Sequence, residues 1–194
     1  MSSQLSEKAK QLIPKAKIMG FKRWKSSDSD EILQIFQQAD DQGRYLTDLE
    51  LTRIEAFSPE RSSAVKKAKI LREKADLIVN YAREKVLTTY PEITELGGTL
   101  YPPERAEACW RDFWHFLRCI TYAIAGNSPQ FTSQEGLENM QLLYQELQVP
   151  LDAMICGLKN LKTYSLQQFN PEEQQELAPY FDHLISHLAC TNVF

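Results

Sequence analysis

One predicted helix places a thiol, a carboxylate and two guanidinium groups close together. Arg105, Cys109 and Asp112 follow one another at spacings of four and three residues, so they share a helical face, with Arg111 beside them. The residues alone fit an ordinary amphipathic helix with a buried cysteine and a surface Arg–Asp pair. They also fit a catalytic thiol, which needs a base within reach. The nearest candidate base is His115, which we expect on the opposite side of the helix from Cys109.

The helix that carries these residues is predicted to run from about Glu104 to Ala125, after a loop that contains Gly97-Gly98 and Pro102-Pro103. Apolar spacings of three and four residues, together with capping residues, predict the other helices. They cover about residues 31–40, 47–57, 60–89, 133–147, 151–164 and 171–190. The pattern indicates seven to nine helices and no strand, so we expect an all-α, globin-like fold.

Composition supports the same fold class. The 194 residues are 43% hydrophobic and include only seven glycines, which fits one helical domain with a full core and argues against a β-sandwich or barrel. Four cysteines are too few for a disulfide framework, and neither a signal sequence nor an apolar run of membrane-spanning length occurs. We therefore expect the protein in the reducing cytoplasm.

The N-terminal arm is basic. Residues 1–25 carry a net charge of +6, although the whole chain sums to −4. A basic arm on an acidic body favours an acidic protein or an anionic lipid surface as a partner, whereas nucleic acid is excluded because the body would repel phosphate. The alternative is an amphipathic segment that packs Leu12, Ile13, Ala16 and Met19 on the body. Pro14 favours this alternative because it interrupts a long membrane-lying helix.

Three strings stand out in the helix of Cys109: Ala108-Cys109-Trp110-Arg111-Asp112, Phe116-Leu117-Arg118 and Thr121-Tyr122-Ala123. Together they resemble the chromophore-attachment helix of the phycobiliproteins, and most of all that of the allophycocyanins. Further similar strings are Gly43-Arg44-Tyr45-Leu46, Tyr90-Pro91-Glu92-Ile93-Thr94 and Tyr180-Phe181-Asp182. The resemblance covers about residues 40–189 almost without gaps. It divides the chain into a basic N-terminal helical extension, residues 1–38, and a globin-like phycobiliprotein domain, residues 39–194.

The resemblance implies a covalently attached linear tetrapyrrole, a bilin, with phycocyanobilin as the expected isomer. Cys109 matches the cysteine that forms the thioether to the bilin. Asp112 matches the carboxylate that accepts hydrogen bonds from the inner pyrrole nitrogens. Arg111 and Arg105 match cations that pair with the propionate groups, for which planar guanidiniums are well suited. The family implies no enzymatic activity and no metal site.

Several residues depart from the family pattern. His115 and Phe116 stand in place of a common tyrosine pair, and Glu104 stands in place of a common arginine. We expect the aromatic side chains of Trp110, Phe113 and Tyr122 to limit rotation of the pigment's rings. The remaining cysteines, Cys119, Cys156 and Cys190, are predicted to be core thiols, and the His183 and His187 pair is predicted to lie on a helix face without a metal.

These observations predict a non-enzymatic, bilin-binding protein that absorbs light and passes excitation energy to a partner in or near the phycobilisome. We expect it to pair with a like or related phycobiliprotein subunit, and to reside in the cytoplasm at the periphery of the thylakoid. Residues 1–25 are the part expected to reach an acidic protein or the anionic thylakoid surface. The altered pocket leaves two alternatives: a bilin-binding photosensory or regulatory protein outside the antenna, and a chromophore-free adaptor with the same fold.

Overall fold

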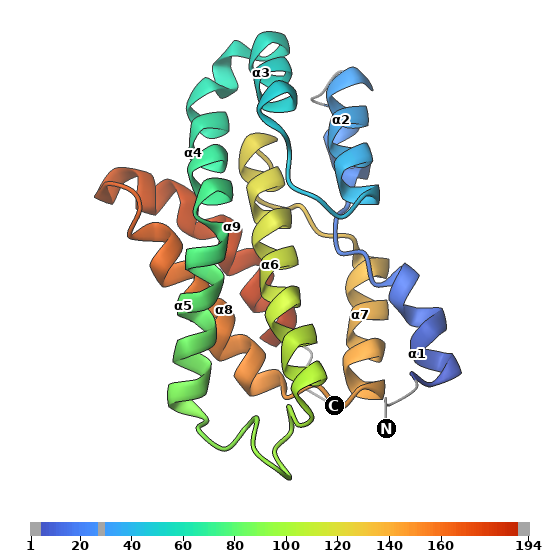
Figure 1. The fold of residues 1–194 in the computed structure, drawn as a ribbon. Coiled ribbons are helices and arrows are strands. Elements are labelled where there is room, and N and C mark those ends of the chain that lie inside the picture. Colours follow the sequence, from blue (N-terminus) through green and yellow to red (C-terminus); the bar gives the residue numbers. More distant parts are fainter. Residues whose placement is uncertain (1–4, 27–29, 190–194) are drawn as a thin grey trace.

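The computed structural model describes residues 5–26 and 30–189, and regular structure in this part of the chain is helical (Figure 1). The α-helices are α1 (Glu7–Leu12), α2 (Asp30–Asp41), α3 (Asp48–Phe57), α4 (Ser62–Glu73), α5 (Ala75–Thr89), α6 (Pro103–Ala125), α7 (Gln134–Glu146), α8 (Leu151–Leu166) and α9 (Pro171–Ala189). Short 3₁₀ helices occupy Ile13–Lys15, Phe21–Ser26 and Pro59–Arg61. The expected all-α fold is confirmed.

Helix α6 forms the centre of the molecule (Figure 1). It contacts α4, α5, α8 and α9. Its second half, residues 116–125, is buried at every position, whereas residues 103–115 alternate between buried and accessible positions. A helix that is buried all round needs close neighbours. At Gly157 of α8, a Cβ atom would lie 2.0 Å from Cζ of Phe113, so only glycine permits this crossing of α6 and α8.

Capping residues explain where several helices begin. Thr47 caps α3 in a reciprocal capping box with Glu50, and Ser133 caps α7 by accepting a hydrogen bond from the amide of Gly136 at 3.2 Å. After α2, Gly43 takes a positive φ of 64°, which glycine adopts without strain. These local signals place the helix boundaries close to the predicted ones.

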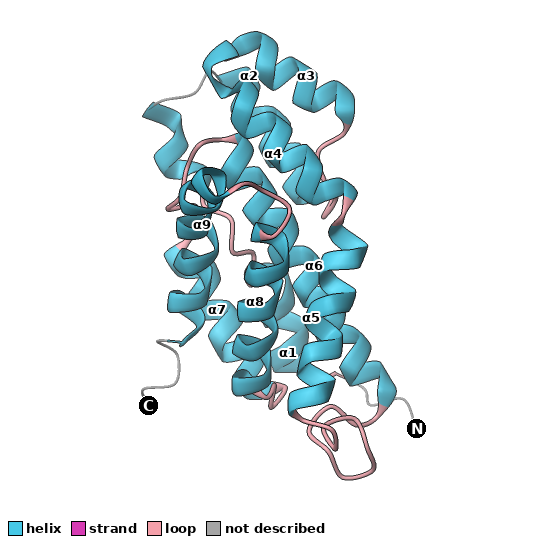
Figure 2. Ribbon diagram, turned by 90° about the vertical axis from the view of Figure 1, so that its left-hand side faces the viewer, coloured by secondary structure: helices cyan, strands magenta, loops and turns pink. Residues whose placement is uncertain are grey.

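The predicted helix over residues 60–89 is wrong as one element. The chain instead forms α4 and α5, with a break at Lys74, whose φ and ψ are −102° and 8°. Across the break the packing partner changes, because α4 lies mainly on α6 and α5 mainly on α8 (Figure 2). The Lys74 ammonium reaches the side-chain oxygen of Gln168 at 2.5 Å, which fixes the break to the α8–α9 loop. No proline or glycine marks this bend in the sequence.

The N-terminal segment packs on α7, outside the central helices (Figure 1). As expected, Leu12 and Met19 are buried and Ala16 packs partly buried against the core. The expectation for Ile13 is wrong, because this side chain is 46% exposed. It lies in the 3₁₀ turn at Pro14, which rotates it away from the face that Leu12 presents to α7.

Within the described residues, no helix is both long enough and apolar enough to cross a membrane.

Candidate functional site

A cavity of about 730 Å³ lies between helix α6, helix α7 and the N-terminal segment. All four sequence-predicted site residues, Arg105, Cys109, Arg111 and Asp112, line it. The opposite walls come from α7, from the end of α2 and from the N-terminal segment, and they include Met140, Leu143, Tyr144, Leu147, Asp40, Asp41, Leu5, Ile13 and Lys17. Its volume is typical of a site for a small organic ligand.

The cavity is elongated because it follows α6 for several turns. Its lining residues on that helix extend from Glu104 to Cys119. At a rise of about 1.5 Å per residue, this stretch is roughly 20 Å long. The cavity therefore suits an extended ligand that lies along α6 with one end near Arg105 and the other near Arg118.

Cys109 contributes a buried thiol to the cavity. Burial is the main cause that raises its pKa to about 12, the nearby Asp112 carboxylate raises it further, and the charge of Arg105 lowers it. The thiol is therefore protonated at neutral pH and is a poor nucleophile unless another group takes its proton. Such a thiol does not act as an activated catalytic cysteine by itself.

Asp112 lies about one turn further along α6, and its charge acts on the Cys109 thiol. The phenol of Tyr144 on α7 donates a hydrogen bond of 2.8 Å to its Oδ2. Burial raises the pKa of Asp112 to about 6, although the Tyr144 hydrogen bond and the charge of Arg111 both lower it. At neutral pH the site thus holds a poorly solvated anion, which favours a ligand that brings N–H donors or positive charge.

The two predicted arginines have different surroundings. Arg105 donates from Nη2 to the backbone carbonyl oxygens of Leu147 and Gln148, at 2.7 and 3.1 Å, just after α7 ends. This anchors its guanidinium at the cavity while other N–H groups remain available. Arg111 is exposed at the cavity and forms no ion pair within the described residues. Both guanidinium groups can therefore donate hydrogen bonds to carboxylates of a ligand.

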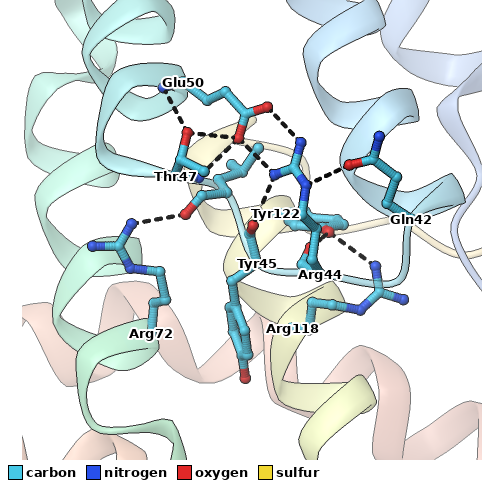
Figure 3. Close-up of polar contacts among 9 residues, drawn as sticks. Gln42, Arg44, Tyr45, Thr47, Glu50, Arg72, Arg118 and Tyr122 are labelled. Atoms are coloured by element: carbon cyan, nitrogen blue, oxygen red, sulfur yellow. Dashed lines mark hydrogen bonds and ion pairs between the residues drawn. The ribbon is translucent and has the colours of Figure 1, made fainter.

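A buried ion pair closes the far end of the cavity, and sequence reasoning missed it. Arg118 lies 2.9 Å from Asp40 and donates a second hydrogen bond of 2.9 Å to the hydroxyl of Tyr122. Tyr122 in turn donates to the backbone oxygen of Arg44, whose guanidinium forms a bidentate pair with Glu50 at 2.8 Å (Figure 3). This network fixes the turn after α2 to α6. Because the partners come from distant elements, no local pattern reveals it.

His115 lines the cavity, contrary to the expectation that it lies on the side of α6 opposite Cys109. The cavity covers a wide sector of the helix, so residues about 120° apart around its axis both reach it. The Nδ1 atom of His115 is buried and has no hydrogen-bond partner within the described residues. Burial and the charges of Arg118 and Arg111 lower its pKa to about 4. His115 is therefore a neutral imidazole with an unused polar atom.

Trp110, Phe113 and Tyr122, whose rings are expected to restrict the pigment, do not line the cavity. Trp110 packs on Phe113, and Phe113 fills the α6–α8 crossing. The aromatic rings at the cavity are Phe116 and Tyr144 instead. The positions of Trp110, Phe113 and Tyr122 around the axis of α6 direct these side chains toward neighbouring helices instead.

Within the described residues, the other cysteines and histidines are not grouped as metal ligands. Cys119 is buried, as expected, and lines the cavity, whereas Cys156 is only half-buried beside Thr89. Cys190 lies outside the described residues. The His183 ring forms a hydrogen bond of 2.8 Å with the Thr132 hydroxyl, and the His187 ring donates a hydrogen bond of 2.7 Å to the backbone oxygen of His183. Residues 5–26 and 30–189 contain no group of three or more metal-ligating side chains.

The donor set of the cavity fits a bilin. Such a ligand is extended, has N–H groups in its middle and has two carboxylates at its edge. The cavity offers a central carboxylate at Asp112, cations at Arg105 and Arg111, and a thiol at Cys109. The unpartnered Nδ1 of His115 supplies one further polar contact.

Comparison with known proteins identifies relatives over most of the chain. The family model for phycobilisome proteins matches residues 34–188. The chain is 32% identical over 158 residues to the allophycocyanin subunit alpha-B of Synechocystis sp., which covers 81% of this chain and 98% of that protein. It is 30% identical over 160 residues to the allophycocyanin beta chain of Aglaothamnion neglectum, covering 82% of this chain and 99% of that protein. It is thus similar to both alpha-type and beta chains.

Proposed function

Because this chain belongs to the phycobilisome protein family, as a divergent allophycocyanin-like member, we propose that it carries a bilin on Cys109 and harvests light in or near the phycobilisome. Phycobiliproteins are light-harvesting pigment proteins, not enzymes. The observation that supports the proposal most strongly is the convergence of Cys109, Asp112, Arg111 and Arg105 on one elongated cavity.

Each of these residues has a distinct task in the proposed site. The Cys109 thiol would form the thioether by adding across a carbon–carbon double bond of the bilin: sulfur bonds to one carbon, the proton from the S–H bond goes to the other, and nothing leaves. The Asp112 carboxylate, oriented by Tyr144, accepts hydrogen bonds from the inner pyrrole nitrogens and favours their protonated form. Arg111 and Arg105 bind the propionate carboxylates. When bound, the pigment supplies visible absorption and an excited state that can pass its energy on. The likeness to allophycocyanins supports phycocyanobilin as the isomer.

We expect the attachment of a bilin to the Cys109 thiol to require an enzyme. A pKa of about 12 leaves very little thiolate at neutral pH, so spontaneous addition to a bilin is slow. We therefore expect a lyase to deliver the pigment and to remove the thiol proton during attachment. Once formed, the thioether carries no charge, so the burial that disfavours the thiolate does not oppose the product.

The same relatives support assembly with a related phycobiliprotein subunit. Large apolar side chains on the outside of α3 and α5 are available for such a contact: Leu49 is 71% exposed, Phe57 47% and Leu77 61%. Exposed apolar groups of this size favour a protein interface. We place the protein in the cytoplasm at the periphery of the thylakoid, with residues 1–38 as an extension to the domain formed by residues 39–194. An anionic thylakoid surface or an acidic protein remains the proposed contact of residues 1–25.

The experiment that tests this function is co-expression of the chain with bilin synthesis and a suitable lyase, followed by denaturing electrophoresis and zinc-enhanced fluorescence. The wild type is expected to keep a fluorescent pigment, and the Cys109→Ala variant to lose it. Cys119→Ala, Cys156→Ala and Cys190→Ala are the matched controls and should keep the signal. A wild-type chain without pigment would favour the chromophore-free adaptor, and a photoreversible spectrum without co-sedimentation with antenna complexes would favour a photosensor.

A further inference from the structure

The N-terminal segment Leu5–Gly20, called here the N-terminal wall, forms one side of the cavity. Its side chains at Leu5, Ile13, Ala16, Lys17 and Ile18 line the cavity directly. The segment lies before residue 34, where the family match begins. The alignment with the Synechocystis relative covers 98% of that protein but 81% of this chain, so about a fifth of this chain has no counterpart in it.

Contacts at both ends attach the wall to the rest of the chain. Near its start, the Ser6 hydroxyl donates to Glu146 of α7 at 2.7 Å, and Lys8 pairs with the same carboxylate at 3.1 Å. Near its end, the amide of Gly20 donates to the backbone oxygen of Phe131 at 2.8 Å, and the amide of Ser133 donates to that of Ile18 at 2.7 Å. Between them, a small apolar cluster joins the wall to α7 through Ala9, Leu12 and Leu143.

Two glycines allow the wall to approach this closely. A Cβ atom at Gly136 of α7 would lie 1.8 Å from the backbone oxygen of Lys17, and one at Gly20 would lie 2.8 Å from the backbone oxygen of Thr132. Glycine also has a lower helix propensity than alanine, by up to about 1 kcal/mol in a helix interior. Gly136 therefore lowers the stability of its own helix but allows the backbone of the wall to pack against it. This indicates that the sequence is adapted to the contact between the wall and α7.

The wall presents both apolar and charged groups to the cavity. Leu5 and Ile13 are large side chains that are 44% and 46% exposed, so a ligand in the cavity would cover apolar area that water now contacts. Lys17 pairs with Asp41 at 2.9 Å, and both side chains are about half exposed. An exposed ion pair of this kind contributes little free energy, so a carboxylate of a ligand can take the place of Asp41.

We propose that the N-terminal wall is part of the pigment site: it completes the bilin cavity within a single chain, and Lys17 binds one propionate carboxylate of the pigment. This inference rests on the proposed function, since it assumes a bilin in the cavity. The apolar side chains of the wall would exclude water from one edge of the pigment and restrict rotation of its rings. A chain built in this way does not need a partner subunit to enclose its chromophore on that side.

The test uses the full chain with Gly136→Ala, which favours helix α7 but displaces the wall, and Glu138→Ala on the exposed surface of α7 as its matched control. In the pigment-free protein, hydrogen exchange of amides 5–20 is expected to speed up at least about tenfold in Gly136→Ala, because the added methyl overpacks the contact. In the loaded protein, this variant should keep its pigment on Cys109 but show a broader absorption band and a lower fluorescence yield. Glu138→Ala should change neither.

Two milder variants test the same proposal if Gly136→Ala fails to fold. Ile13→Gln removes an apolar wall contact without touching the core, and Lys17→Gln removes the charge, with Lys10→Gln as its control because Lys10 pairs with Glu7 and lies outside the cavity. Both should lower the fluorescence yield, whereas the control should not.

The outcomes separate this inference from the proposed function. A pigmented wild type, together with Ile13→Gln and Lys17→Gln proteins that have unchanged spectra and yields, would overturn the wall proposal alone. A wild type that carries no pigment would overturn the proposed function and, with it, the wall.

Discussion

Asp112 is expected to weaken the pigment-free protein at neutral pH, and Asp112→Asn is the change that reveals it. The carboxylate lies partly buried at the cavity, and burial raises its pKa from 3.8 to about 6. In the unfolded chain its pKa is close to the ordinary value. The folded protein therefore binds this proton more tightly than the unfolded chain does. The stability that results is fully present below about pH 4 and is lost as the pH rises through 6.

The size of the effect follows from the pKa difference. A pKa raised from 3.8 to about 6 corresponds to at most about 3 kcal/mol, and contact with water in the cavity reduces it. Asparagine has nearly the same shape, carries no charge and can still accept the hydrogen bond that Tyr144 donates. Asp112→Asn should therefore stabilise the pigment-free protein at pH 8 by up to about 3 kcal/mol and change its stability little at pH 4.

Urea unfolding of the pigment-free wild type and Asp112→Asn proteins between pH 4 and 8 measures this difference. If the free energy of unfolding falls by about 2–3 kcal/mol per molar of urea, the urea midpoint of the variant should rise by as much as about 1 M at pH 8. In the loaded protein the advantage should vanish, because the bound pigment pairs with the charge. A variant that is less stable than the wild type at pH 8, or a difference that does not vary with pH, would refute the reasoning.

Three further predictions concern neighbouring parts of the structure. Gly157→Ala should destabilise the protein by about 1–3 kcal/mol in urea unfolding, because its methyl would overlap Phe113; an unchanged midpoint would show that α6 and α8 can separate freely. Arg118→Met should cost about 3 kcal/mol by leaving Asp40 buried without its cation, and adding Asp40→Asn should recover part of that loss; equal stability of the single and double variants would contradict this account. Alkylation of Cys109 by iodoacetamide, followed by mass spectrometry, should keep accelerating as the pH rises toward 12, and a plateau near pH 8 would show that the thiol is not buried as described.

The helical elements could be predicted from the sequence because their signals are local. The helix predicted over residues 47–57 is found as α3, which a capping box of Thr47 and Glu50 begins, and α6 begins and ends close to its predicted bounds. The break at Lys74 could not be predicted, because it arises from a change of packing partner between α4 and α5, not from a proline or glycine.

In the cavity, too, residues close together in the sequence could be placed, whereas contacts between distant parts of the chain could not. Arg105, Cys109 and Asp112 share one helical face, so their spacing alone was enough to bring them together. His115 and the partner of Asp40 could not be placed, because their positions depend on how far the cavity extends around α6 and on helices distant in the sequence. The sequence predicted that the N-terminal segment packs on the body, but not that it lines the cavity, because that position depends on contacts with α7, which is distant in the sequence.

The central claim is that one pigment is attached covalently to Cys109, and peptide mapping tests it most directly. Trypsin cleaves after Arg105 and Arg111, so Cys109 lies alone in the six-residue peptide Ala106-Glu107-Ala108-Cys109-Trp110-Arg111. After co-expression with bilin synthesis and a lyase, we predict that the visible absorption and the added mass of one bilin elute with this peptide. Absorption that stays with a peptide containing Cys119, Cys156 or Cys190, or a colourless six-residue peptide with an unmodified thiol, would contradict the claim.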